Sequence, residues 1–361
     1  MSPLAAPKGA EELTAQWLTL ALREGGSLSD AAVAEIRVQP LGTAGVGFLS
    51  GLARVELGYD RPAAAAPQSL VAKFPAAGDT RELGDSLNAY EREIRFYREI
   101  APRSPVRTPR CYGTTLDLDQ GAFVLLLEDG TPWRAGDQVR GLTQQEAEEC
   151  LRAIAPFHAQ WWQSTELEHL TWMPLENMDL LTLFDQNWPA FRARFAPELT
   201  PAEIDVGEHL CRHGAQLLER IGARPHTLVH WDYRADNLLF DDASAERRVV
   251  VLDWQLTERS VGAYDVGRLL GGSLREKEPD YRRLVALWHA DLLAHGVTGY
   301  GEADAWADFQ LSLLTLLYNP VSFFSICEQS GKRGRALMYA MVHRLFHAAV
   351  ACDAVEALAA G

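Results

Sequence analysis

Residues 230–240 read HWDYRADNLLF, and residues 249–255 read VVVLDWQ. Asp232 lies five residues before Asn237, and Asp253 follows sixteen residues after that asparagine. Taken singly, polar residues of this kind are typical of turns, and a carboxylate after an apolar run can simply end a strand. The order and separation of the three side chains make coincidence improbable, so we interpret them as one site.

This spacing is the one that phosphoryl transfer from a nucleotide requires. The reaction depends mainly on positioning and on neutralising charge on the phosphate oxygens. Asp232 would receive the proton of an acceptor hydroxyl, while Asn237 and Asp253 would hold Mg²⁺ against the β- and γ-phosphates. The sequence therefore predicts ATP or GTP, with Mg²⁺, as cofactors.

The two segments resemble those of the aminoglycoside phosphotransferase and choline kinase-like superfamily, in which His-Gly-Asp-x-x-x-x-Asn precedes Asp-Trp or Asp-Phe. Trp231 stands here at the position of the usual glycine. Protein kinases carry Asp-Phe-Gly at the metal segment, from which Trp254 and Gln255 depart. The run GAYDV at residues 262–266 is similar to the ecdysteroid kinase-like branch and related bacterial phosphotransferases. The resemblance implies an α+β, two-lobed protein-kinase-like fold and a small-molecule acceptor.

The change of pattern along the chain agrees with two lobes. Strand-like alternation occurs at residues 35–38, 53–57 and 69–74, a helical pattern follows at 88–100, and a buried strand at 123–127. Later segments are mostly helical: 143–162, 202–221, 281–295, 303–317 and 332–358. We therefore predict a small N-terminal nucleotide-binding lobe with an antiparallel sheet and a helix (1–128), and a larger helical, catalytic and substrate-binding lobe (129–361).

Lys73 ends a probable central strand, from which its amine could reach the α- and β-phosphates. A buried amine needs a carboxylate partner, and Glu93 lies twenty residues later on the following helix. In the resembled families Glu-x-x-Phe-Tyr marks this helix, which selects Glu93 over Glu91. The alternative is a lysine that extends to solvent and a glutamate in a surface pair.

The run GTAGVGFLSG at residues 42–51 lies between two predicted strands, where small residues let backbone N–H groups approach phosphates. We place Gly45, Gly47 and Ser50 nearest the nucleotide, although a purely structural loop would read the same way. Glu128 and Asp129 mark the hinge, where backbone groups would contact the adenine edge, and Glu128 is the predicted contact.

Arg234 lies two residues after the proposed base and could stabilise charge on the transferring phosphoryl group. It could equally pair with Asp236. We expect His230 and His158 to be structural. The resemblance implies that Asp265 supports the catalytic loop from a following helix, although a carboxylate there could simply interact with the helix dipole.

Bulk properties exclude several classes of protein. The 361 residues carry a net charge of −15, which argues against non-specific nucleic-acid binding. No run of about 18 uninterrupted apolar residues predicts a membrane span. Five widely spaced cysteines favour neither disulfides nor zinc, so we expect a cytoplasmic protein. We expect it to be a monomer or a homodimer.

These observations predict a Mg²⁺-dependent kinase that phosphorylates a hydroxyl of a small molecule such as an antibiotic, an amino alcohol or a sterol-like alcohol. One alternative is a nucleotide-binding pseudokinase that acts as a scaffold. An atypical protein kinase is disfavoured, because only ten residues separate Asp253 from Tyr264, too few for a typical activation loop.

Overall fold

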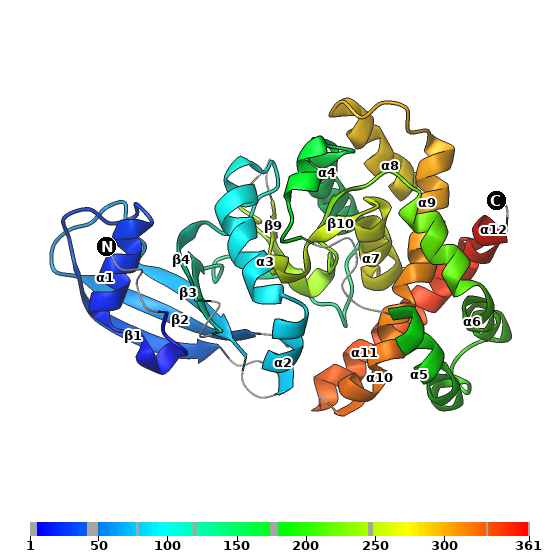
Figure 1. The fold of residues 1–361 in the computed structure, drawn as a ribbon, viewed down its shortest axis with the longest axis horizontal. Coiled ribbons are helices and arrows are strands. Elements are labelled where there is room, and N and C mark those ends of the chain that lie inside the picture. The colour runs from blue at the N-terminus through cyan, green and yellow to red at the C-terminus, as the bar shows by residue number, and fades with distance from the viewer. Residues whose placement is uncertain are drawn as a thin grey trace. The chain divides into compact units, whose positions relative to one another are not determined.

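A computed structural model describes residues 6–41, 50–76, 79–117, 121–173, 180–244, 248–329 and 331–359. The chain forms two compact units, Met1–Arg134 with Val250–Leu256, and Ala135–Val249 with Thr257–Gly361 (Figure 1). The predicted boundary lies after residue 128, whereas the first unit extends to Arg134 and takes in the segment that carries Asp253.

The first unit is built on an antiparallel sheet of strand order β1-β2-β3-β5-β4 (Figure 1). Its strands are β1 (Val33–Leu41), β2 (Ser50–Tyr59), β3 (Ser69–Pro75), β4 (Cys111–Asp117) and β5 (Ala122–Glu128). β5 is buried from Ala122 to Leu127, because its apolar run lies inside the sheet with both faces covered. The sheet fits the expected N-terminal lobe, although β4 gave no clear signal in the sequence.

Helices complete the first unit. They are α1 (Ala15–Glu24), α2 (Asp79–Ser86) and α3 (Ala89–Arg95), with short turns at Ala10–Glu12 and Ala101–Arg103. The side chain of Thr14 caps α1 by accepting from the backbone N–H of Trp17, 3.1 Å away. The helix predicted at 88–100 is not regular throughout, because Phe96–Ile100 forms a π-helical turn after α3.

The second unit is mostly helical. Its helices are α4 (Gln144–Trp161), α5 (Leu180–Phe195), α6 (Pro201–Gly222), α7 (Ala263–Ser273), α8 (Tyr281–Ala294), α9 (Glu302–Leu316), α10 (Tyr318–Gln329), α11 (Gly331–Ala351) and α12 (Ala354–Ala359). Thr143 and Glu146 form a capping box that begins α4, and Thr200 and Glu203 do the same for α6. Both helices were predicted from their helical pattern, at residues 143–162 and 202–221.

Short strands and turns flank the loop that carries the proposed catalytic residues. β7 (Thr227–Val229) pairs with β10 (Glu258–Ser260), and β8 (Leu238–Phe240) follows the single turn Ala235–Asn237. Other short elements are β6 (Arg134–Ala135), β9 (Val249–Val251) and the turns Thr165–His169 and Trp254–Leu256. The loop is thereby held at both ends by strands.

α7 is buried along its whole length and supports that loop. A Cβ at Gly271 would lie 2.6 Å from a methyl carbon of Leu313 in α9, so a side chain there would force Leu313 to move. The helical stretch Glu302–Gln329 is apolar and long enough to cross a membrane by length and composition alone, but 67% of its most apolar window is buried inside the protein. It therefore has the burial of a core element.

One of the later predictions needs correction, and one helix was missed. The single helix expected at 332–358 is two helices, because α11 ends at Ala351 and Asp353 takes a left-handed φ of 50° before α12. α5 was not predicted, since Pro189 inside it disguises the helical pattern.

Candidate active site

Lys73 lies on β3, opposite Leu52 of β2 and Leu125 of β5. Its Nζ is 2.7 Å from Oε2 of Glu93 on α3, and 2.6 Å from Oδ1 of Asp253. The side chains of Lys73 and Glu93 are 7% and 1% exposed. The predicted pairing with Glu93 is confirmed, and the sequence did not show that Asp253 would be a second partner.

Burial and charge act in opposite directions in this cluster. Burial would lower the pKa of Lys73, but the charges of Asp253 and Glu93 outweigh it, so the pKa of the amine rises. Burial raises the pKa of Glu93 to about 7, and the charge of Asp253 adds to this effect, while Lys73 opposes it. One ammonium group is thus shared between two carboxylates and stays charged.

Asp253 is positioned by its neighbours. Its φ is 64°, a left-handed conformation that a non-glycine residue adopts at an energetic cost. The next residue, Trp254, stacks on Phe96 with ring centroids 4.0 Å apart, and its Nε1 donates to the carbonyl of Val251. Gln255 Nε2 donates to Asp253 Oδ2 over 3.2 Å. These contacts fix the carboxylate against Lys73.

The remaining nucleotide-site predictions have mixed outcomes. Ser50 is buried, and its Oγ donates to Oε1 of Gln255 over 3.4 Å, so it lies beside the Asp253 segment. Gly45 and Gly47 lie outside the described residues. The backbone N–H of Glu128 donates to the carbonyl of Arg110, and its side chain accepts from the Arg110 N–H. A contact between Glu128 and a nucleotide stays a prediction.

In the second unit, the side chain of Asp265 on α7 holds the backbone of the loop. Its Oδ2 accepts from the N–H of His230 at 2.7 Å, and its Oδ1 accepts from the N–H of Trp231 at 2.9 Å. The ring of buried His158 lies 3.1 Å from the same carboxylate, and Trp288 Nε1 donates to its other nitrogen. Both Asp265 and His158 are therefore structural supports, as the sequence indicated.

Trp231 has a φ of 70°, which explains why the resembled families carry glycine at this position. Its ring stacks on that of Tyr264, with centroids 5.6 Å apart. The stacking and the bond from its N–H to Asp265 hold a conformation that a tryptophan disfavours.

Asp232 is surrounded by cations. Arg234 Nε donates to both of its oxygens at 3.0 and 3.1 Å, and Arg268 donates to Oδ1 through Nε at 3.1 Å and Nη2 at 2.6 Å. Burial alone would raise the pKa of Asp232, but the charges of Arg234 and Arg268 outweigh it and hold the pKa well below its usual range. Asp232 is therefore ionised at neutral pH.

Asn237 completes the surroundings of Asp232. Its Nδ2 donates to the backbone carbonyl and to Oδ2 of Asp232, both at 2.9 Å. Because the amide nitrogen is used in this way, the oxygen Oδ1 is the atom that can coordinate a metal ion.

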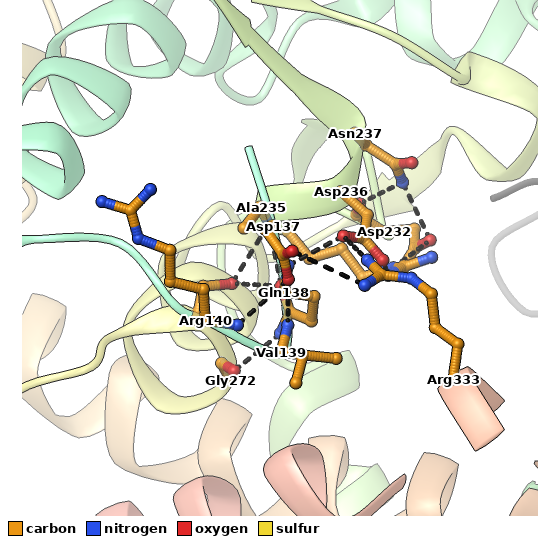
Figure 2. A network of polar contacts seen from close by, with 12 residues as sticks. Asp137, Gln138, Val139, Arg140, Asp232, Ala235, Asp236, Asn237, Gly272 and Arg333 are labelled. Carbon is orange, nitrogen blue, oxygen red and sulfur yellow. Dashed lines mark hydrogen bonds and ion pairs between the residues drawn. The ribbon is translucent and has the colours of Figure 1, made fainter. Parts of the chain in front are cut away.

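Of the two roles that the sequence left open for Arg234, the structure shows the pairing with Asp236, and a bond to Asp232 is added to it. It bonds Asp232, and its Nη1 donates to Oδ2 of Asp236 at 2.9 Å. Asp236 also accepts from the N–H of Gln138 at 2.7 Å and from Nη2 of Arg333 at 3.0 Å (Figure 2). Figure 2 shows Arg333 extending from α11 toward the loop. The loop is thus braced from three directions.

Sequence reasoning missed three of these residues, Gln138, Arg268 and Arg333. Arg268 lies in a mostly apolar segment, residues 263–273, whose other charged residue is Asp265. This was a usable signal, because buried arginines are rare unless paired. The sequence contains no such signal for Arg333, since this residue lies 97 residues from Asp236. Among the described residues, no cluster of three or more His, Cys, Asp or Glu side chains could hold a metal ion alone.

Comparison with known proteins identifies the family of this chain. The model of the ecdysteroid kinase-like family matches residues 44–296, more than half of the chain. No curated protein matches the sequence significantly.

Solved structures share the fold at low identity. A complex of APH(2″)-IIIa with GDP and kanamycin is 16% identical to this chain. Its TM-score is 0.54, and the match covers 89% of this chain and 95% of that one. A microcompartment-associated aminopropanol kinase is 17% identical, with a TM-score of 0.50 and coverages of 94% and 96%. A choline/ethanolamine kinase family protein from Mesorhizobium loti is 13% identical, with a TM-score of 0.50 and coverages of 90% and 93%.

At these identities the likeness to solved structures shows the fold alone. It is the predicted α+β, two-lobed, protein-kinase-like fold of small-molecule phosphotransferases. Together with the family match, it establishes that the chain belongs to the ecdysteroid kinase-like family.

Proposed function

We propose that this protein is a Mg²⁺- and nucleotide-dependent O-phosphotransferase that acts on a hydroxyl of a small organic molecule. The observation that carries the proposal is the buried ammonium of Lys73, held by Glu93 and Asp253 at 2.7 and 2.6 Å. A fixed, charged amine is the group that holds nucleotide phosphates in kinases.

The roles in the first unit follow from this cluster. Lys73 would bind the α- and β-phosphates, because its charge is maintained by two carboxylates. Glu93 would keep the amine in place, while Ser50, through Gln255, supports the segment that presents Asp253. Gly45, Gly47 and Glu128 remain proposed nucleotide contacts.

The residues fit a magnesium ion. Mg²⁺ is usually held by one or two protein oxygens together with phosphates and waters, so a larger protein cluster is unnecessary. Asn237 Oδ1 and the carboxylate of Asp253 would supply those oxygens. When bound, the ion would neutralise developing charge on the phosphate oxygens.

Asp232 would orient the acceptor hydroxyl and take its proton. Its depressed pKa makes it a weak base, which suits a loose transition state in which the proton leaves late. Arg234, beside Asp232, would stabilise charge on the transferring phosphoryl group. The acceptors named for structural neighbours, kanamycin and aminopropanol, support a small-molecule hydroxyl without identifying it.

The proposal is tested by nucleotide-induced stabilisation, followed by transfer. Mg²⁺ with ATP or GTP at about a hundred times the dissociation constant should stabilise the protein by roughly 2.7 kcal/mol. Asp253→Asn should lose the metal-dependent part, whereas Asp232→Asn should retain the shift and abolish transfer of radiolabelled γ-phosphate. No shift with either nucleotide would contradict the proposal. A shift without transfer to any alcohol would favour the pseudokinase.

We also propose a cytoplasmic location. The support is that Cys111, Cys150, Cys211, Cys327 and Cys352 are all free thiols in the structure. Thiols persist in a reducing compartment. Cell fractionation with an antibody against the chain tests this location, and recovery in a secreted or membrane fraction would contradict it.

A further inference from the structure

Arg268 has a bonding capacity that the protein does not use. The residue is 6% exposed, and it donates Nε and Nη2 to Oδ1 of Asp232. Its Nη1 is buried and has no hydrogen-bond partner within the described part of the chain. Leaving a charged donor buried and unpaired is costly, because its hydration is lost without replacement. A ligand oxygen at Nη1 would remove that cost.

The three arginines around the loop differ in how completely they are paired. Arg234, Arg268 and Arg333 bond only two loop carboxylates, Asp232 and Asp236. Arg333 also lies 3.5 Å from Asp137, whose side chain is 44% exposed. Arg234 bonds both loop carboxylates and Arg333 pairs with Asp236 and Asp137, whereas Arg268 bonds a single oxygen, Oδ1 of Asp232, and keeps one donor that no described residue uses.

The surroundings of Arg268 belong to the helical unit. Tyr264 lies one turn earlier on α7, and its hydroxyl accepts from Nδ2 of Asn319 on α10 at 3.2 Å. Burial raises the pKa of the Cys327 thiol on α10, and the charges of Arg234 and Arg268 oppose that rise. Arg268 is thus close to α10 as well as to Asp232. All of these belong to the helical unit, which is the predicted substrate-binding lobe.

We propose that Arg268 binds an oxyanion of the acceptor, so that the substrate is a hydroxy compound with a carboxylate, sulfate or phosphate group near the reacting hydroxyl. The inference rests on the proposed function, since Asp232 is taken to orient that hydroxyl. A guanidinium is suited to the task because its planar donors match an oxyanion. A cationic amino alcohol would instead place its ammonium group beside the guanidinium of Arg268, and like charges repel.

The first experiment tests the anion site without any acceptor. Thermal stability is measured with acetate or inorganic phosphate at constant ionic strength, balanced with chloride, for wild type, Arg268→Gln, Arg268→Lys and Arg283→Gln. Arg283 is a matched control, because its half-exposed side chain pairs with Glu148 elsewhere on the unit. We expect saturable stabilisation of wild type and Arg283→Gln, a weaker effect in Arg268→Lys and none in Arg268→Gln. Equal stabilisation of all four proteins, or none in wild type, would overturn the proposal.

The second experiment compares three acceptors of one size, glycerate, glycerol and 3-amino-1,2-propanediol. One charge-assisted hydrogen bond should favour glycerate over glycerol by about 10- to 100-fold in kcat/KM. Arg268→Gln should abolish this ratio whatever happens to the rate itself. An unchanged ratio with both rates reduced would assign Arg268 to the transferring phosphoryl group, and preference for the amine would likewise refute the inference.

The two proposals fail in different ways. Loss of the proposed function would appear as no Mg²⁺-nucleotide stabilisation in wild type, whether or not acetate or phosphate binds. Loss of the present inference would appear as normal nucleotide stabilisation with no anion effect that depends on Arg268.

Discussion

Replacing Glu93 with glutamine should make the stability of the protein less dependent on pH. Glu93 is fully buried beside Lys73 and Asp253, and burial raises its pKa to about 7. A carboxyl group whose pKa is higher in the folded state stabilises the fold at low pH, and this contribution is lost as pH rises through the folded pKa. Glutamine resembles the neutral carboxyl and does not titrate.

The size of the effect on stability follows from the shift in the pKa of Glu93. Moving a carboxyl pKa from 4.5 to about 7 corresponds to roughly 3 kcal/mol, at about 1.4 kcal/mol for each tenfold change in proton affinity. The wild type should lose this contribution between about pH 4.5 and pH 7, relative to Glu93→Gln. The variant should therefore gain on the wild type as pH rises, although one ion pair has been removed.

Urea unfolding at pH 5 and pH 8 measures the effect, with Glu91→Gln as the matched control. Glu91 lies on the same helix and pairs with Arg95 at 2.7 Å, where the arginine side chain is 39% exposed. We expect the control to change stability by less than about 1 kcal/mol at either pH. If Glu93→Gln were destabilised more at pH 8 than at pH 5, the pair with Lys73 would be a net stabilising ion pair and the reasoning would be wrong.

Three further predictions concern the catalytic loop. Asp265→Asn should destabilise the protein by about 2–4 kcal/mol in urea unfolding, because a charged acceptor of several buried hydrogen bonds is replaced. Trp231→Gly should change stability by less than about 1 kcal/mol in the same assay, since relief of the left-handed conformation offsets the lost stacking on Tyr264. Asn237→Ala should raise the Mg²⁺ concentration for half-maximal phosphate transfer about tenfold or more, and an unchanged Mg²⁺ dependence would exclude Asn237 as a ligand.

The sequence was most informative where motif and local pattern coincide. A buried amine demands a carboxylate, which pointed to the helix after the strand of Lys73, and the family resemblance selected Glu93 over Glu91 on that helix. The fold class followed from the early alternating segments and the later helical ones. Asp265 followed from the resemblance, and its bonds to the loop backbone give that role a physical basis.

The sequence was least informative where contacts are distant or geometry is irregular. The bond between Lys73 and Asp253 spans 180 residues, and nothing local announces it. The π-helical turn Phe96–Ile100 has the same apolar spacing as a regular helix would show. Arg333 lies on a helix whose existence was predicted, but the direction of its side chain depends on how α11 packs.

The contrast between Glu93 and Asp232 bears on how the proposed reaction would depend on pH. Both carboxylates are buried, yet the pKa of Glu93 is raised and that of Asp232 is lowered. Glu93 shares one ammonium with Asp253, whereas Asp232 receives two guanidinium groups and the amide of Asn237. The number of cations for each carboxylate therefore decides the direction, because burial acts alike on both.

In the proposed reaction, Asp232 would therefore not set the acidic limb of the pH–rate profile. Protonation of Glu93 below about pH 7 would weaken its hold on Lys73, so transfer should fall there while Asp232 is still ionised. In Glu93→Gln this limb should disappear, at a uniformly reduced rate. An acidic limb near pH 7 that persists in Glu93→Gln would mean that the titration of a group other than Glu93 governs the rate.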